Sequence, residues 1–189
     1  VGKATAKFLV TIIRAIKPAE RLEIGCCIGF SSILMASLKD PRCHITTIDR
    51  YPIMIREAKA NFKKFGLEDK ITLLEGDAGK ILPDMDRKFD FIFLDAAKGQ
   101  YLHFLPHCIR MLNTGGVLLA DDAMQNGYVA MDRYSVPRRH RTTHRRMREF
   151  IYAVTHARGL ESCIIPCDNG LVMCTKTIDK VEINISGFD

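Results

Sequence analysis

In the stretch Asp90-Phe91-Ile92-Phe93-Leu94-Asp95-Ala96-Ala97-Lys98, a short apolar run lies between charged side chains. A run of this kind is typical of a strand that is buried on both faces in a parallel sheet. In open α/β sheets, ligands bind just beyond the carboxyl ends of the strands. Because Asp95 and Lys98 follow the run directly, the stretch favours a functional site there. The alternative is a solvated turn between a strand and a helix.

The segments on either side of this strand alternate between strand and helix patterns. Further strands are predicted at residues 21–24, 44–49, 71–75, 116–122, 162–166 and 170–175. Helices are predicted before Pro18 and at residues 31–38, 52–65 and 100–111. The alternation predicts an α/β fold with a mostly parallel seven-stranded sheet, formed by a single domain at residues 1–177. Residues 178–189 form a C-terminal tail to which the sequence assigns no role.

The composition is that of a globular protein without a membrane span. The chain has 189 residues, of which 47% are hydrophobic. No apolar run reaches the roughly 18 residues that suggest a transmembrane helix. Seven cysteines without a C-x-x-C pair are typical of a reduced, cytoplasmic protein, and a metal site at Cys163 and Cys167 is the disfavoured alternative. No secretory signal is visible, and because the chain opens at Val1, an upstream segment could be missing.

Residues 133–148, which we call the arginine segment, hold the net positive charge. The chain carries +6, and this segment contains seven arginines and no acidic residue. An apolar stripe that begins at Met147 predicts a helix in its second half, capped by Thr142 or Thr143. Arg145 would then lie in the first helical turn. So many cations without an acid indicate phosphate binding, and the alternative is a solvated arginine face.

A glycine-bearing turn follows the first predicted strand. The spacing Gly25-x-x-x-Gly29 lets the backbone approach a ligand closely, although glycines there can also serve only to pack a helix against a strand. The spacing differs from the G-x-G-x-x-G of dinucleotide dehydrogenases, which disfavours that class. Asp49 ends the next strand, at the position where an acid holds ribose hydroxyls in nucleotide-binding α/β folds.

Two further strand ends carry acidic residues. Asp95 ends the strand at 91–94, and Asp121 and Asp122 end the strand at 116–122. On one edge of a sheet these carboxylates would repel one another, and a hard divalent cation would relieve the repulsion. The alternative is that Asp122 points into solvent as a turn residue.

Taken together, these motifs resemble those of class I S-adenosylmethionine-dependent methyltransferases. Within that class the chain is similar to the cation-dependent O-methyltransferases related to catechol and caffeoyl-CoA methyltransferases, over about residues 22–175. The resemblance implies a Rossmann-like fold with helices on both faces of the sheet. It rests on Glu23-x-Gly25-x-x-x-Gly29-x-Ser31, Asp49, Gly76-Asp77-Ala78, Leu94-Asp95-x-x-Lys98-x-x-Tyr101 and Leu119-Ala120-Asp121-Asp122.

The resemblance implies roles for residues at the strand ends. The cofactor, S-adenosylmethionine, would contact Gly25, Gly29, Ser31, Asp49, Arg50, Asp77, Ala78 and Asp95. A divalent cation, expected to be Mg²⁺, would be bound by Asp95, Asp121 and Asp122. The relatives usually have asparagine where Asp122 stands, a departure that keeps an oxygen ligand and adds a negative charge.

The arginine segment is similar to that of bacterial members that methylate 5-hydroxyuridine at the wobble position of tRNA. In that nucleoside the 5-hydroxyl lies beside the O4 carbonyl, so both oxygens can chelate one cation, as a catechol does. The resemblance implies that Asp95 and Lys98 are catalytic, with Lys98 as the base if its surroundings keep the amine neutral. The partner would be tRNA, and its backbone would contact Arg138, Arg139, Arg141 and Arg145.

Two other functions stay open. The same chemistry could act on a small catechol-like metabolite, with the arginines serving solubility or binding substrate carboxylates. The chain could also be a catalytically silent RNA-binding relative, a reading that the intact Asp95, Lys98, Asp121 and Asp122 disfavour. Related enzymes are often dimers, so a homodimer is a further expectation.

Overall fold

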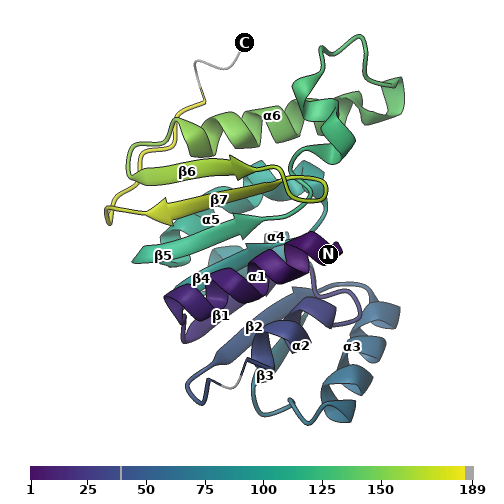
Figure 1. The fold of residues 1–189 in the computed structure, drawn as a ribbon, viewed down its shortest axis with the longest axis vertical. Coiled ribbons are helices and arrows are strands. Elements are labelled where there is room, and N and C mark those ends of the chain that lie inside the picture. Colours follow the sequence, from purple (N-terminus) through teal and green to yellow (C-terminus); the bar gives the residue numbers. More distant parts are fainter. Residues whose placement is uncertain (39, 186–189) are drawn as a thin grey trace.

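The computed structural model describes residues 1–38 and 40–185 and places a single sheet at the centre of that part of the chain (Figure 1). Its seven strands lie in the order β3-β2-β1-β4-β5-β7-β6. They are β1 (Glu20–Ile24), β2 (His44–Asp49), β3 (Ile71–Glu75), β4 (Phe89–Leu94), β5 (Leu112–Ala120), β6 (Leu160–Ile165) and β7 (Leu171–Lys176). The expected strand number is thus confirmed for the described residues.

The sheet is mixed, because β7 runs antiparallel to both of its neighbours, β5 and β6. The strands from β1 to β5 are parallel where they pair. A parallel connection needs a crossover of about a dozen residues or more, whereas only residues 166–170 separate β6 from β7. The short turn therefore requires a hairpin at this edge of the sheet.

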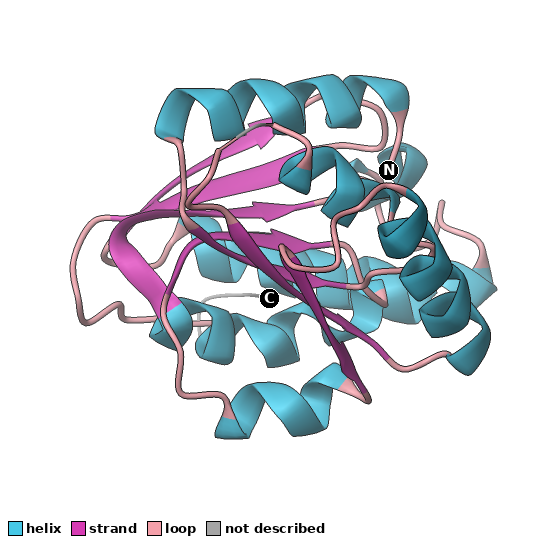
Figure 2. Ribbon diagram, turned by 90° about the horizontal axis from the view of Figure 1, so that it is seen from below, coloured by secondary structure: helices cyan, strands magenta, loops and turns pink. Residues whose placement is uncertain are grey.

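Helices cover both faces of the sheet, as expected for a Rossmann-like fold (Figures 1 and 2). One face is covered by α1 (Lys3–Ile16), α2 (Phe30–Ala36) and α3 (Pro52–Lys64). The other is covered by α4 (Ala78–Asp84), α5 (Tyr101–Met111) and α6 (Arg141–Thr155). Short 3-10 turns are η1 (Lys98–Gln100), η2 (Gln125–Ala130) and η3 (Arg138–His140).

Strand β4 lies in the middle of the sheet and contributes to both apolar layers. Phe91 and Phe93 pack with residues of α1, α2 and α3, whereas Ile92 and Leu94 pack with residues of α4, α5 and α6. All four side chains are fully buried. Because successive side chains of a strand point to opposite faces, a continuous apolar run is what a strand between two helix layers needs.

Two features of the helices differ from the sequence-based expectations. Helix α4 was not predicted. Helix α6 begins at Arg141 after η3, with His140 at its N-cap and no side-chain cap, so the expected caps Thr142 and Thr143 are wrong. The reason is that the 3-10 turn η3 runs directly into the helix. Arg145 consequently lies in the second turn of α6, away from the unpaired backbone N–H groups of the first turn.

The chain after β7 continues along the molecule as far as it is described. Arg158 forms an isolated β-bridge with Glu182, and Val181 and Ile183 pack against the core. Residues 186–189 of the expected tail lie outside the described residues. No described helix is both long enough and apolar enough to cross a membrane.

Candidate functional site

A cavity of about 510 Å³ lies at the carboxyl ends of β1, β2, β3 and β4. Six of the eight residues predicted to contact a cofactor line it, namely Gly25, Asp49, Arg50, Asp77, Ala78 and Asp95. These residues lie together because the carboxyl ends of neighbouring parallel strands meet at the same edge of the sheet. Cofactor contact by these residues stays a prediction, and the structure places them where such contact is possible.

Gly25 allows the ends of β1 and β4 to approach each other. Its φ is +104°, and a Cβ there would lie 2.3 Å from the backbone oxygen of Asp95. Both the conformation and the close contact exclude a side chain. The turn thus brings backbone, rather than side chain, to the wall of the cavity.

Gly29 and Ser31 lie outside the cavity lining. Gly29 caps α2, and a Cβ there would lie 2.5 Å from the Phe62 ring. Ser31 is buried in the first turn of α2. Both residues help to form the turn on the side away from the cavity. Their contact with a cofactor stays a prediction.

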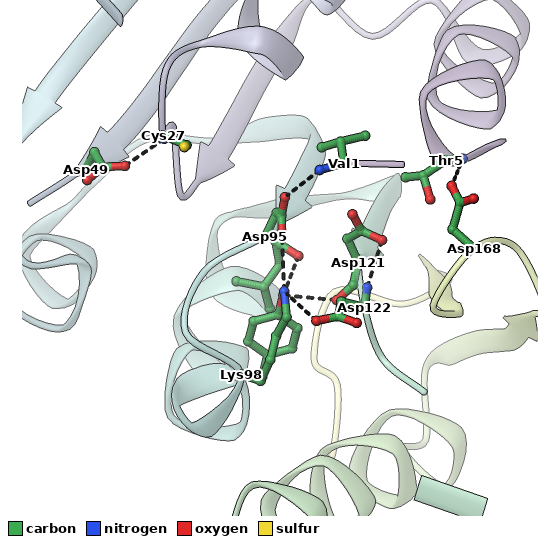
Figure 3. Close-up of polar contacts among 11 residues, drawn as sticks. Val1, Thr5, Cys27, Asp49, Asp95, Lys98, Asp121, Asp122 and Asp168 are labelled. Atoms are coloured by element: carbon green, nitrogen blue, oxygen red, sulfur yellow. Dashed lines mark hydrogen bonds and ion pairs between the residues drawn. The ribbon is translucent and has the colours of Figure 1, made fainter. Parts of the chain in front are cut away.

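The backbone fixes the carboxylate of Asp49 at the end of β2. Its two oxygens accept hydrogen bonds from the N–H groups of Cys27, at 2.7 Å, and Tyr51, at 3.0 Å (Figure 3 shows the first). Arg50 turns instead to Asp77, with 2.7 Å between Nη1 and Oδ2, and this contact lowers the pKa of the Asp77 carboxyl group. The cavity wall therefore contains one carboxylate held by backbone N–H groups, Asp49, and one ion pair, Arg50 with Asp77.

A second group of charges, which we call the acid cluster, contains Asp95, Lys98, Asp121 and Asp122 (Figure 3). The Lys98 Nζ lies 3.0 Å from Asp95 Oδ1 and 3.6 Å from Asp122 Oδ2. The amino group of Val1 lies 3.9 Å from the other Asp95 oxygen. Strand ends of β4 and β5 thus meet as predicted, and Asp122 faces Lys98 rather than solvent alone.

The hydroxyl of Tyr101 hydrogen-bonds Lys98 and the backbone at the ends of β4 and β5. Lys98 donates a hydrogen bond to the Tyr101 hydroxyl at 3.1 Å, and that hydroxyl contacts the backbone oxygens of Leu94 at 2.9 Å and Asp121 at 3.1 Å. Burial and the charge of Asp95 raise the pKa of Tyr101, so the phenol stays protonated. A neutral, fully buried phenol therefore ties the lysine to the ends of both strands.

The residue types of the acid cluster suit a hard cation, although their side chains are not arranged around one in this structure. Burial, and then the charge of Asp95, raise the pKa of Asp121. A cation would neutralise that excess charge, and carboxylate oxygens are suitable ligands for it. Within the described part of the chain, however, no three His, Cys, Asp or Glu side chains are positioned to hold a metal ion as they stand. Metal binding stays a prediction.

Glu23 is a buried acid for which the sequence offered no role. It is fully buried in β1, and its Oε2 accepts hydrogen bonds from the hydroxyls of Ser32 and Thr47, while Oε1 has no hydrogen-bond partner among the described residues. Burial raises the pKa of this carboxyl group to about 7. The side chain is therefore poised to titrate inside the fold near neutral pH.

Several arginines of the arginine segment have partners within the fold although most of them are exposed. Arg141 donates to the backbone oxygens of Val136 and Tyr134 at 2.9 and 3.2 Å, and Arg145 pairs with Glu149 at 3.7 Å. Arg139 donates from Nε to the neighbouring His140 Nε2 at 3.0 Å, so three of the four arginines predicted to contact RNA already have partners within the fold. Arg138 and Arg139 are both exposed on η3.

One arginine outside the predicted set connects this segment with the acid cluster. Arg146 donates from Nη1 to the backbone oxygen of Gly99 at 3.1 Å, directly beside Lys98. The arginine segment therefore borders the acid cluster. No sequence pattern distinguishes Arg146 from its neighbours, because the contact depends on how α6 packs against η1.

Sequence reasoning also missed several residues of the cavity wall. They come from the turn after β1, the start of α3 and the start of α5, and none belongs to a recognisable motif. Their positions follow from packing alone. They include Cys27, Tyr51, Met54, Gln100, His103 and Phe104.

Comparisons with known proteins show which family this chain is similar to. The family model described as O-methyltransferase matches residues 1–177. A catechol O-methyltransferase of Mycobacterium tuberculosis is 30% identical over 128 residues, covering 67% of this chain and 58% of that protein. Tapetum-specific methyltransferase 1 of Arabidopsis thaliana is 26% identical over 175 residues, covering 90% of this chain and 75% of that protein.

Solved structures share the fold. A provisionally named caffeoyl-CoA O-methyltransferase from Staphylococcus aureus superposes with a TM-score of 0.87 at 28% identity, covering 93% of this chain and 84% of that one. An O-methyltransferase from Bacillus cereus, solved in complex with SAH, has a TM-score of 0.83 at 22% identity, covering 93% and 82%. The second likeness shows the fold alone.

Proposed function

Because this chain belongs to the O-methyltransferase family, we propose that it transfers the methyl group of S-adenosylmethionine to a hydroxyl beside a second oxygen. One observation carries the proposal. Asp95 lines the cavity and also bonds Lys98, so the space for a cofactor and the charged groups share a wall. An acceptor bound at the acid cluster would therefore lie next to a cofactor bound in the cavity.

Lys98 is the residue that moves the proton in this proposal. Asp95 and Tyr101 hold its amine at 3.0 and 3.1 Å, which fixes its position. For this role the amine has to give up its own proton before it accepts the proton of the acceptor hydroxyl. The oxygen then attacks the methyl carbon, and the new C–O bond forms as the bond to the sulfonium sulfur breaks. Holding both reactants in line can supply about 7–11 kcal/mol of the barrier reduction.

Asp95, Asp121 and Asp122 are the residues that would hold a divalent cation. Such a cation, when bound, would lower the pKa of the acceptor hydroxyl and orient the two oxygens. The support for this part is the all-carboxylate donor set and the raised pKa of the buried Asp121.

For the acceptor we propose 5-hydroxyuridine at the wobble position of tRNA. The support is the exposed pair Arg138 and Arg139, on a segment that reaches the Lys98 turn through Arg146. A small catechol-like metabolite is the second candidate, and the names of the relatives support it, since they include catechol and caffeoyl-CoA O-methyltransferases. A catalytically silent RNA-binding role is disfavoured by the intact Asp95–Lys98 pair.

The test is incubation with S-adenosylmethionine carrying a labelled methyl group, with hypomodified tRNA or a catechol panel as acceptor. Label should appear in tRNA, and EDTA or the Asp95→Ala substitution should abolish transfer. Label in catechols alone would move the acceptor to the second candidate. Full transfer in EDTA would contradict the role of the cation. No transfer to either acceptor would contradict the proposed methyltransferase activity.

A further inference from the structure

Tyr134 is an unusually exposed aromatic side chain in the arginine segment. Its side chain is 85% exposed, more than any other large hydrophobic residue in the described chain. Single exposed apolar residues are common and need no explanation by themselves. The turn that carries Tyr134 and the charges around it make this one informative.

The turn that presents Tyr134 is held by side chains on both sides of it. Asp132 accepts hydrogen bonds from the Tyr134 N–H, at 2.7 Å, and from the Ser135 hydroxyl. Arg141 bonds the backbone oxygens of Tyr134 and Val136, and Val136 is buried to 1% exposure. The ring is thus displayed from a fixed backbone rather than from a loosely tethered loop, which lowers the entropy cost of binding to it.

The surroundings of the ring are cationic. The Arg141 guanidinium lies 5.9 Å from the ring centroid, and Arg133, Arg138 and Arg139 are exposed nearby in the sequence. An aromatic face among arginines is how proteins bind single-stranded nucleic acid, since bases stack on the ring while phosphates contact the cations. A protein partner would instead require a larger apolar area than one ring provides.

The segment also lies where a nucleic acid entering the site would pass. It follows β5 and leads into α6, on the side toward which β5 points (Figure 1). From α6, Arg146 reaches the Lys98 turn. A strand with one base at Lys98 would therefore continue over the arginine segment.

We propose that Tyr134 is a stacking platform for an unpaired base of the RNA acceptor, with Arg138 and Arg139 binding neighbouring phosphates. The inference rests on the proposed tRNA acceptor and deepens it. The ring would select unpaired RNA, because a base within a duplex is already stacked on both sides.

Fluorescence anisotropy with a labelled anticodon stem-loop tests this inference, with a fully paired RNA of equal length as the comparison. Tyr134→Ala should weaken stem-loop binding by about 5- to 150-fold, the range that stacking of one base implies, without changing the salt dependence. Tyr134→Phe should bind like the wild type. The double variant Arg138→Gln/Arg139→Gln should weaken binding and flatten its salt dependence.

Phe65→Ala is the matched control, because Phe65 is an exposed aromatic residue just past the end of α3. It should leave RNA binding unchanged, and equal thermal midpoints should show that every variant folds. Wild-type binding with no loss in Tyr134→Ala, or an equal loss for duplex RNA, would overturn the stacking role and leave the tRNA acceptor standing. A wild type that binds no stem-loop would overturn both.

Discussion

In the proposed reaction, the position of one amine, that of Lys98, decides whether the acceptor hydroxyl can lose its proton. Lys98 is fixed by a carboxylate, Asp95, and by a buried phenol, Tyr101, within about the length of a hydrogen bond. A rigid amine can meet an acceptor hydroxyl without the loss of further side-chain freedom. Replacing it should therefore affect the reaction more than the binding of either reactant.

Lys98→Met is expected to lower turnover by about 10²–10⁴-fold, the usual contribution of a positioned acid or base. S-adenosylhomocysteine should bind with unchanged affinity, because the lysine is not part of the cavity wall. Transfer kinetics and calorimetric titration measure the two quantities. Lys64→Met, an exposed position on α3, is the control. Normal turnover in Lys98→Met would remove Lys98 as the base.

Glu23 predicts a pH dependence of stability. Its pKa rises from 4.5 to about 7 on folding, so the folded protein binds more protons than the unfolded chain between these values. The free energy of unfolding should therefore fall as the pH rises through this window, by up to about 3 kcal/mol from this group. Glu23→Gln should remove that part of the slope, as measured by urea unfolding at several pH values.

A control on the same strand separates this effect from surface charge. Glu20 begins β1, and its carboxylate forms a surface ion pair with Arg87. Glu20→Gln should keep the pH slope of the wild type. Equal slopes in the wild type and Glu23→Gln would show that the buried carboxyl group does not titrate as argued.

The sequence predicted the residues that follow strands and missed those that packing brings in. The sequence placed four acids on one edge of the sheet because each stands at the carboxyl end of a predicted parallel strand. They are Asp49, Asp95, Asp121 and Asp122. His103 reaches the cavity wall only because α5 packs beside it. Nothing in the local sequence encodes such a contact.

Among the elements, the junction of β1 and β4 is the least tolerant of change. Gly25→Ala would place a Cβ 2.3 Å from the Asp95 backbone oxygen, whereas Gly66→Ala would meet nothing within 4 Å. Both positions have positive φ, which alone costs about 1–2 kcal/mol. Gly25→Ala should lose clearly more unfolding free energy than Gly66→Ala in urea titrations. Equal losses would mean that the two strand ends can separate at little cost.

Helix α6 supports the Lys98 turn through Arg146. Loss of its hydrogen bond to Gly99, worth about 1 kcal/mol, should lower turnover of Arg146→Ala about fivefold if the whole effect falls on the transition state. Cofactor affinity should not change, which separates positioning of the turn from damage to the cavity. Arg148→Ala, exposed on the same helix, is the control. An equal decrease in both variants would assign the effect to lost positive charge.

Element prediction succeeded where the pattern was strong. The β4 run of four buried apolar residues and the Pro52 start of α3 were sufficient for prediction. Helix α4 was missed because it has only seven residues and contains Pro83, so helical spacing cannot be recognised in it. The start of α6 was misplaced because η3 supplies the first turn without a capping side chain.

At the scale of the whole molecule, the account depends on two sites that share Asp95. The cavity spans the ends of β1, β2, β3 and β4, and the acid cluster spans the ends of β4 and β5. The mixed sheet preserves this arrangement, because its antiparallel strand β7 lies beyond β5. The sequence predicted seven strands but not their order, and it did not predict that the arginine segment contacts Gly99.

The most direct measurement is a crystal structure of this protein with S-adenosylhomocysteine. The nucleoside should fill the cavity, with its ribose hydroxyls on Asp49 and its sulfur facing the side of the cavity where Asp95 meets Lys98. A nucleoside bound elsewhere, or a ribose without contact to Asp49, would contradict the account.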